Sequence, residues 1–187
     1  GAPRLHLYGA GATLRVAAQR LRRECGPNGL LHPEVGRRLN LEVHRVRAFE
    51  PVVAGRYRVT PFAANHDPVV EPLLYAVAAE GRSLFYGVDT ASLPGETWRA
   101  LRRTEQRFNL VILDHTYGPE EEESDHLSAR TLIAHAQRMR EEGLLAPDGR
   151  VFATHIAHEG NPPHPELTAF AADHGYEVAY DGLTLSV

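Results

Sequence analysis

The chain has 187 residues, of which 43% are hydrophobic and 24% are charged, a composition typical of one globular domain with a single core. Its formal net charge of −4 gives no sign of a basic nucleic-acid surface, and no apolar run is long enough to cross a membrane. Cys25 is the single cysteine, which excludes an internal disulfide, and no secretory signal is visible, so we expect a cytoplasmic protein.

The first quarter of the chain predicts a strand, a helix and a second strand. Gly1-Ala2-Pro3 contains no initiating methionine and leads directly into a strand at Arg4–Tyr8, so we expect an earlier segment to have been removed. Apolar residues at helical spacing predict a helix at Ala12–Arg23, and the glycine, proline and asparagine content of Cys25–Leu39 indicates a loop with a short helix. Leu41–Phe49 is typical of a strand.

The middle of the chain predicts a strand and a hairpin, and both lead into polar side chains. The strand predicted at Arg56–Ala64 runs directly into His66. The apolar runs Leu73–Glu80 and Ser83–Val88 are separated by a Gly-Arg dipeptide, which is a β-hairpin signal, and the second run ends at Asp89.

The second half alternates helices with strands. Ser128 can cap a helix that extends to about Glu142. The other elements predicted here are helices at Pro94–Phe108 and Pro165–His174 and strands at Leu110–Leu113, Val151–Thr154, Glu177–Tyr180 and Leu183–Ser186, the last two around an Asp181-Gly182 turn. The mixed order predicts one α/β domain over residues 1–187, with a helix-covered mixed sheet and a second sheet packed on it.

Histidine and aspartate residues follow three of these predicted strands. They occur in Asn65-His66-Asp67, Val88-Asp89-Thr90 and Thr154-His155-Ile156. Side chains at strand ends can converge on one rim of a sheet, and imidazole and carboxylate are ligands that suit zinc, manganese or iron. The pattern therefore predicts a metal site, although Asp89 alone would be an ordinary turn residue.

Most of the eleven histidines have an ordinary structural interpretation, because a single histidine is more often a surface or core residue than a ligand. We apply this interpretation to His6, His32, His44, His135 and His174. His158 flanks the loop at residues 159–163, where it could reach the mouth of a site, but a surface position is the simpler interpretation.

Six sequence blocks together resemble one enzyme family. In chain order they are Thr60-Pro61-Phe62-Ala63-Ala64-Asn65-His66, Phe85-Tyr86-Gly87-Val88-Asp89-Thr90, Leu113-Asp114-His115-Thr116-Tyr117-Gly118, Ser124-Asp125-His126, Ala153-Thr154-His155-Ile156-Ala157-His158 and Tyr180-Asp181-Gly182. They are similar to the second half of a metallo-β-lactamase-fold hydrolase, nearest to the branch that contains the phosphoribosyl cyclic phosphodiesterases. The tRNA 3′-processing endonucleases are more distant relatives.

This resemblance implies an αββα sandwich, the metallo-β-lactamase fold, with two divalent metal ions, zinc or manganese, at one edge of the paired sheets. Matched by position, His66 resembles a ligand of the first metal and His155 a ligand of the second. Asp89 resembles the carboxylate that bridges both metals. His126 resembles a histidine that protonates the leaving group as a general acid.

The neighbours of these ligands are less well defined by the sequence. A metal-binding histidine holds its second ring N–H against an acceptor. Asp67, Asp125 or a backbone carbonyl could provide this acceptor, and His158 is a further candidate beside the site.

One part of the family pattern is missing. The motif His-x-His-x-Asp-His, which supplies ligands to both metals in the family, has no match in residues 1–187. In the family it precedes a segment like Leu5–Gly11, so we expect this chain to be the C-terminal portion of the domain, N-terminally incomplete, with weak or no activity by itself. Exposed sheet edges would then favour a homodimer.

We therefore expect a metal-dependent hydrolase, and specifically a phosphodiesterase whose substrate is a small phosphate ester. A metal-bridged hydroxide would attack phosphorus and His126 would protonate the leaving group. The alternatives are a hydrolase of the same fold that acts on thioesters, lactones or nucleic acid, and a non-catalytic binding or carrier protein. The nuclease alternative would need a basic arm, and none is visible.

Overall fold

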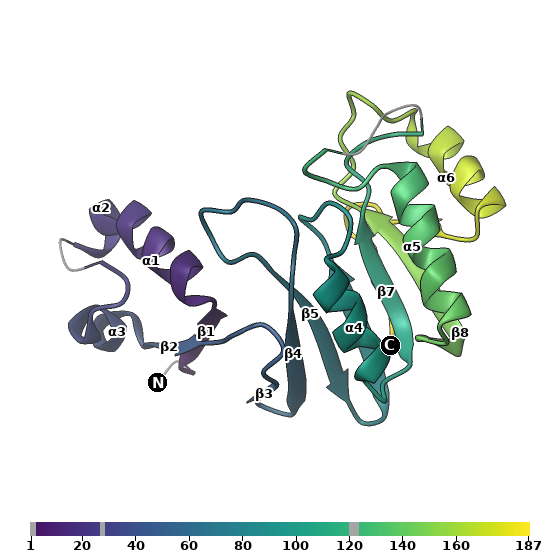
Figure 1. Ribbon diagram of the computed structural model, residues 1–187. Coiled ribbons are helices and arrows are strands. Elements are labelled where there is room, and N and C mark those ends of the chain that lie inside the picture. Colours follow the sequence, from purple (N-terminus) through teal and green to yellow (C-terminus); the bar gives the residue numbers. More distant parts are fainter. Residues whose placement is uncertain (1–2, 27–28, 120–123) are drawn as a thin grey trace.

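The computed structural model describes residues 3–26, 29–119 and 124–187, which form six helices and nine strands. The N-terminal residues build a two-stranded sheet with three helices, and the remaining residues build a seven-stranded sheet with three more (Figure 1). The mixed α/β architecture predicted from the sequence is confirmed. The second sheet has two strands in the described part of the chain, and it has a core of its own instead of packing on the large sheet as predicted (Figure 1).

The two-stranded sheet is parallel and packs its helices against one face. Its elements are β1 (Leu5–Gly9), α1 (Gly11–Arg20), α2 (Arg22–Cys25), α3 (Pro33–Leu39) and β2 (Leu41–Arg45). Leu7 and Leu41 pack with the buried side chains of Cys25, Leu30 and Val35, which form a small core of their own. Because successive strand residues alternate between faces, the opposite face of this sheet carries the side chains of His6, Tyr8, Glu42 and His44.

The seven-stranded sheet changes from antiparallel to parallel pairing at its fourth strand. The strands, in spatial as well as sequence order, are β3 (Val52–Ala54), β4 (Tyr57–Ala63), β5 (Leu73–Ala79), β6 (Arg82–Gly87), β7 (Phe108–Asp114), β8 (Leu145–Thr154) and β9 (Glu177–Val178). Strands β3 to β6 are antiparallel neighbours, whereas β6 to β9 are parallel neighbours. The carboxyl ends of β6, β7 and β8 therefore lie along the same edge of the sheet.

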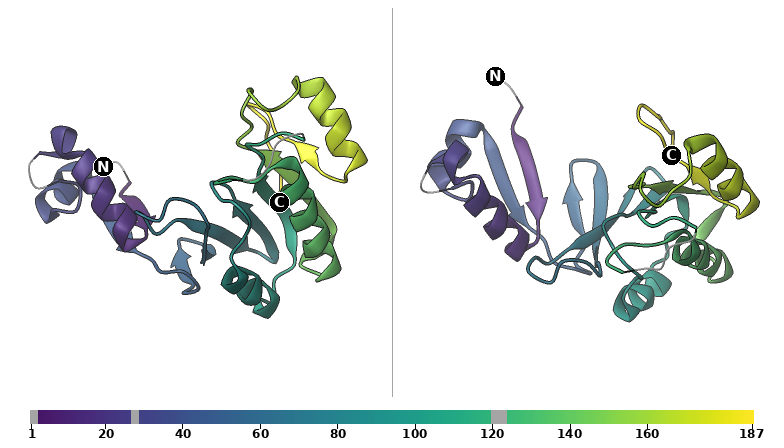
Figure 2. Two further views of the ribbon diagram at one scale, coloured as in Figure 1. Left: turned by 45° about the horizontal axis from the view of Figure 1, so that its top comes forward. Right: turned by 90° about the horizontal axis from the view of Figure 1, so that it is seen from above.

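The main core lies between this sheet and the helices that connect its parallel strands. These helices are α4 (Gly95–Arg103), α5 (Ala129–Glu141) and α6 (His164–Asp173). Phe85, Val111 and Leu113 on the strands are fully buried and share one cluster with Leu101 of α4 and Met139 of α5. The three helices consequently cover one face of the sheet, as the view from above shows (Figure 2).

The opposite face of the seven-stranded sheet is also apolar. Its register places Tyr75 beside Tyr86 and Tyr86 beside Ile112, with Val77 and Leu84 paired in the next row. None of the described helices packs on this row, and Tyr86 is 44% exposed.

The predicted hairpin between β5 and β6 is confirmed. Its two-residue turn consists of Glu80 and Gly81, one residue earlier than the predicted Gly81-Arg82, and these residues have φ values of 53° and 77°. Positive φ at both central positions is typical of a type I′ turn, whose twist matches that of the flanking strands.

Two predicted helices are shorter than the sequence pattern suggested. The helix predicted at Pro94–Phe108 ends before Thr104, whose ψ is 140° and whose hydroxyl accepts a hydrogen bond from the Gln106 amide. This local bond competes with the helical one. The helix predicted at Ala12–Arg23 is divided at Leu21, where ψ is 13° instead of a helical value.

The hairpin predicted from Glu177–Tyr180 and Leu183–Ser186 is wrong. The turn itself forms, because the Leu183 amide donates to the Tyr180 carbonyl at 3.0 Å. In the structure as described, however, only Glu177–Val178 is a strand, and it pairs in parallel with β8 and not with the residues after the turn. The three-residue strand β3 was not predicted, since three residues are too few to show an alternation.

Candidate metal centre

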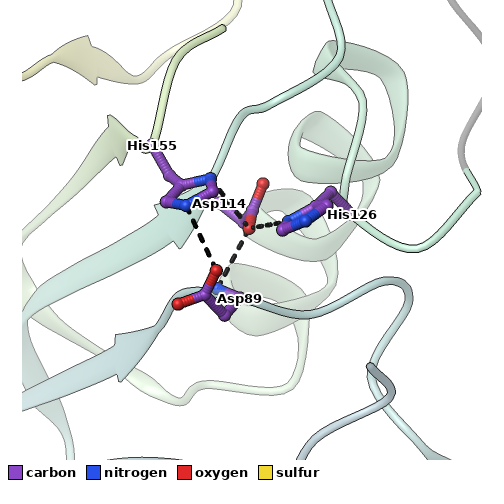
Figure 3. Close-up of side chains that lie close together, drawn as sticks. All are labelled: Asp89, Asp114, His126 and His155. Atoms are coloured by element: carbon purple, nitrogen blue, oxygen red, sulfur yellow. Dashed lines mark hydrogen bonds and ion pairs between the residues drawn. The ribbon is translucent and has the colours of Figure 1, made fainter. Parts of the chain in front are cut away.

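Three acidic or histidine side chains lie at the carboxyl ends of adjacent parallel strands. Asp89 follows β6, Asp114 is the last residue of β7, and His155 follows β8. They meet with His126, which comes from the loop before α5 (Figure 3). The candidate ligand atoms of these four residues lie within 4.8 Å of one another. The structure thus brings together three of the residues selected from the sequence and adds Asp114.

Asp89 and His155 leave their strands through the same unusual backbone conformation. Both have a φ of 58°, in the left-handed region that L residues rarely adopt, although aspartate and histidine do so more often than most. His155 Nε2 lies 3.1 Å from Asp89 Oδ1. Backbone strain of this kind persists where the surrounding structure enforces it and is concentrated at functional sites.

Asp114 orients its neighbours in the site through hydrogen bonds. Its carboxylate is fully buried and accepts four hydrogen bonds, from the Asp89 amide, from His126 Nδ1 and from the amide and hydroxyl of Thr116. The bond from His126 is 2.8 Å long and the bond from Asp89 is 3.0 Å long. One side chain therefore fixes both the backbone at Asp89 and the ring of His126.

Asp114 was not predicted as a site residue, although the sequence contains a usable signal for it. Asp114 ends a continuous apolar strand, as Asp89 does, and an ionisable residue at the end of such a strand needs partners when it is buried. The same rule that selected Asp89 and His155 would have selected Asp114.

Three imidazole rings stand in a row across the site. The ring centroid of His126 lies 4.7 Å from that of His66 and 5.0 Å from that of His155. His126 is held in this central position because the next two residues, Leu127 and Ser128, are buried, and Ser128 caps α5. The structure thus places His66, which follows β4, beside the residues that follow β6 to β8.

Each of the three rings is held through its Nδ1 atom. His66 Nδ1 donates to the backbone carbonyl of Asp125 at 3.1 Å, and His126 Nδ1 donates to Asp114. His155 Nδ1 lies 2.8 Å from the Thr116 hydroxyl, which in turn donates to Asp114. An imidazole whose Nδ1–H is engaged offers Nε2 as its free lone pair, which is the usual arrangement of a metal-binding histidine.

The donor set fits divalent metal ions. One group of candidate ligands consists of Asp89, Asp114, His126 and His155, and a second consists of His66, Asp125 and His126. Nitrogen and oxygen donors of this kind suit zinc and related ions. Because Asp114 already accepts four hydrogen bonds, it has less lone-pair capacity left for an ion than Asp89 or His155 in the first group.

The structure gives different positions to the three residues that the sequence suggested as neighbours of the metal ligands. The backbone carbonyl of Asp125 holds His66, and its carboxylate accepts hydrogen bonds from Tyr117 and Ser124, which lower the pKa of Asp125 to about 2, the Tyr117 hydroxyl contributing most. The Asp67 carboxylate instead accepts from the Val69 amide in its own turn. His158 belongs to none of the candidate ligand groups found among the described residues.

The sequence also matches a known protein family. The Beta-lactamase superfamily domain matches residues 4–156, which is most of the chain. The chain belongs to this family. The family predicted from the six sequence blocks is therefore confirmed, and the phosphoribosyl cyclic phosphodiesterase branch stays a prediction. No curated protein matches the sequence significantly.

Solved structures with the same fold include three that cover nearly all of this chain. The metallo-β-lactamase fold protein YhfI from Bacillus subtilis is 16% identical, with a TM-score of 0.65 over 98% of this chain and 65% of its own. Unliganded yeast PDE1 is 14% identical, with a TM-score of 0.69 over 96% and 59%. Zn²⁺-bound PqqB from Methylobacterium extorquens is 16% identical, with a TM-score of 0.63 over 98% and 63%.

These likenesses establish the fold, and the chain spans 65% or less of the length of each of these three proteins. Among the described residues, no helix is both long and apolar enough to cross a membrane.

Proposed function

We propose that this protein is a metal-dependent phosphodiesterase whose substrate is a small phosphate ester. The observation that carries the proposal is the position of His126, which stands between His66 and His155 and is held by the buried Asp114 at 2.8 Å. Its side chain is 14% exposed, so it is accessible from the site yet fixed in orientation.

The residues present support two divalent ions, zinc or manganese, as the cofactor. His155 and Asp89 would hold one ion and His66 would hold the other. When bound, such ions activate water and polarise a phosphoryl oxygen near neutral pH. The Nδ1 contacts of the three histidines keep the rings from turning, which preserves the geometry that in-line attack requires.

His126 has the role of general acid in this proposal. Its Nδ1–H is engaged by the Asp114 carboxylate, so Nε2 is the atom that delivers a proton to the departing alkoxide. The hydrogen bond to Asp114 holds the ring of His126 in one orientation, in the way that a buried aspartate orients the histidine of a catalytic triad.

A leaving-group comparison tests the proposal. A nitrophenyl phosphodiester releases a stable phenolate without protonation, whereas an alkyl phosphodiester requires a proton on its leaving oxygen. We expect His126→Asn to lower kcat on the alkyl ester by about 10²–10⁴-fold and to change the nitrophenyl reaction much less.

The same assay distinguishes the alternatives. A thioester and a lactone are offered under identical conditions with zinc and with manganese. Faster hydrolysis of either one than of both phosphodiesters would contradict the phosphodiesterase proposal. Equal losses of His126→Asn on the two phosphodiesters would remove the general-acid role and leave the metal-dependent hydrolysis in place.

A further inference from the structure

The exposed face of the two-stranded sheet carries a second cluster of metal-ligating side chains. The parallel register pairs His6 with Glu42 and Tyr8 with His44. Since residues two apart in a strand share a face, these four side chains project from the same side of the sheet. The helices α1 to α3 pack on the other side, through Leu7.

The three donor groups already lie at nearly the separation that a metal ion requires. His6 Nδ1 and His44 Nε2 are 2.9 Å apart, and the Glu42 carboxylate oxygens are 3.9 Å from the first and 3.8 Å from the second. Ligand atoms around tetrahedral zinc, at about 2.0–2.1 Å from the ion, are about 3.3 Å from one another. One ligand atom from each of the three residues lies within 4.8 Å of the others, so small side-chain rotations bring the donors to these separations.

We propose that His6, Glu42 and His44 bind one divalent transition-metal ion, for which zinc is the best match. Two imidazole nitrogens at 2.9 Å can be bridged by one shared proton or by a cation, and a metal ion replaces that proton. The neighbouring Glu42 carboxylate supplies a negative charge, which favours a divalent cation over a single shared proton. Two imidazoles and one carboxylate form the three-ligand set of an open zinc site, with the fourth position left to water.

The surroundings of the cluster favour a defined geometry. The ring of Tyr8 stacks on His44, with centroids 4.5 Å apart and planes inclined by 14°. The side chains of His6, Glu42 and His44 are 45%, 45% and 31% exposed, so an ion can enter from solvent. Arg4 Nη1 contacts Glu42 at 3.1 Å, but its side chain is 60% exposed and can turn away when an ion binds.

This site is separate from the candidate metal centre. Strands β1 and β2 lie at the end of the molecule opposite to α6 and apart from β7 and β8 in each view (Figures 1 and 2). The sequence had suggested an ordinary structural interpretation for His6 and His44. That interpretation took each histidine alone. The pairing of β1 with β2 brings together side chains that are separated by 36 or 38 positions in the chain.

Zinc binding can be measured at this site without any enzymatic assay. The reference protein carries Asp89→Ala and His155→Ala, which remove two of the proposed ligands of the candidate metal centre. It is dialysed against zinc alone, and bound zinc is determined by mass spectrometry and by competition with a fluorescent chelator. We expect His6→Asn together with His44→Asn to remove about one zinc equivalent per chain from this reference protein.

The matched control is His174→Asn, which removes an exposed histidine from outside the candidate ligand groups and should leave the zinc content unchanged. Circular dichroism verifies that each variant is folded, and cobalt substitution provides a second readout, because a tetrahedral cobalt spectrum should disappear with the two histidines. Equal zinc content with and without His6 and His44 would overturn the proposal. Absence of zinc from the reference protein would overturn it as well.

Discussion

Asp114 holds several residues of the candidate metal centre in place through hydrogen bonds. It is fully buried, and donors from Asp89, Thr116 and His126 all point at its two oxygens. An amide in its place has one acceptor oxygen and two N–H donors, so some of these donors would face another donor. A buried donor left unsatisfied costs about 1–3 kcal/mol.

We predict that Asp114→Asn weakens zinc binding by about 10–100-fold, as the loss of a group that orients metal ligands typically does. The free energy of unfolding should also fall by about 1–3 kcal/mol. Zinc titration and urea denaturation measure the two effects. Asp148→Asn is the matched control, because Asp148 is exposed and pairs only weakly with Arg82 at 3.4 Å. Unchanged zinc affinity in Asp114→Asn would show that the ligands are oriented without it.

Substitutions at Asp89 can distinguish the role of its carboxylate from the requirement for its positive backbone φ. Its φ of 58° is accessible to asparagine, whereas a β-branched residue adopts it only with strain of about 1–3 kcal/mol. We predict that Asp89→Asn keeps its stability within about 0.5 kcal/mol and loses metal-dependent turnover, while Asp89→Val loses both. Urea denaturation measures the stability, and hydrolysis of the alkyl phosphodiester in the presence of zinc measures the turnover. Full turnover by Asp89→Asn would contradict a ligand role for this carboxylate.

At the scale of single residues, the sequence contains much of the site. Asp89 and His155 were selected because each follows an apolar strand, and the structure brings them within 3.1 Å of one another. Their shared positive φ and the link from His155 through Thr116 to Asp114 were not predictable, because they depend on the neighbouring strand.

At the scale of elements, the start of α5 determines where His126 can be. Ser128 Oγ accepts from the Thr131 amide, and the Thr131 hydroxyl accepts from the Ser128 amide, which together form a capping box. The same segment pairs with Tyr117, so the loop that carries His126 is fixed at its far end. The sequence predicted this cap, because a serine before an apolar stripe is a strong local signal.

We predict that Ser128→Ala lowers the free energy of unfolding by about 0.5–2 kcal/mol, since the Thr131 amide loses its acceptor. Urea denaturation with a fixed slope provides the measurement. Thr168→Ala serves as the control, because the Thr168 hydroxyl bonds only within its own helix, to the carbonyl and ring of His164, and the change should stay within about 0.5 kcal/mol. Equal effects of the two substitutions would mean that the cap contributes nothing specific.

The elements that the sequence did not predict depend on partners distant in the chain. The end of α4 is set by the Thr104 hydroxyl, and the strand Glu177–Val178 exists because β8 offers an edge to it. Periodicity reports which residues share a face, but it does not report whether a neighbouring edge is available. The hairpin predicted at the C-terminus failed for this reason, whereas the β5–β6 hairpin, whose turn residues carry the signal, succeeded.

At the scale of the whole molecule, the helices of the described residues lie on one face of each sheet. The helices α1 to α3 pack on one side of the small sheet, and α4 to α6 pack on one side of the large sheet (Figures 1 and 2). In the row formed by Tyr75, Tyr86 and Ile112, Tyr86 is exposed and the other two side chains are partly buried. Apolar sheet faces of this kind favour association.

We predict that residues 1–187, prepared by themselves, associate into homodimers through this row, and that Tyr86→Lys shifts the protein toward the monomer. Tyr86 is 44% exposed at the centre of the row, and a buried lysine there would be unpaired. Tyr180→Lys is the matched control, because Tyr180 is 59% exposed and lies outside the strands. Light scattering across a concentration series measures the mass. A monodisperse monomer of the unaltered chain at high concentration would contradict the prediction, as would an equal shift by the control.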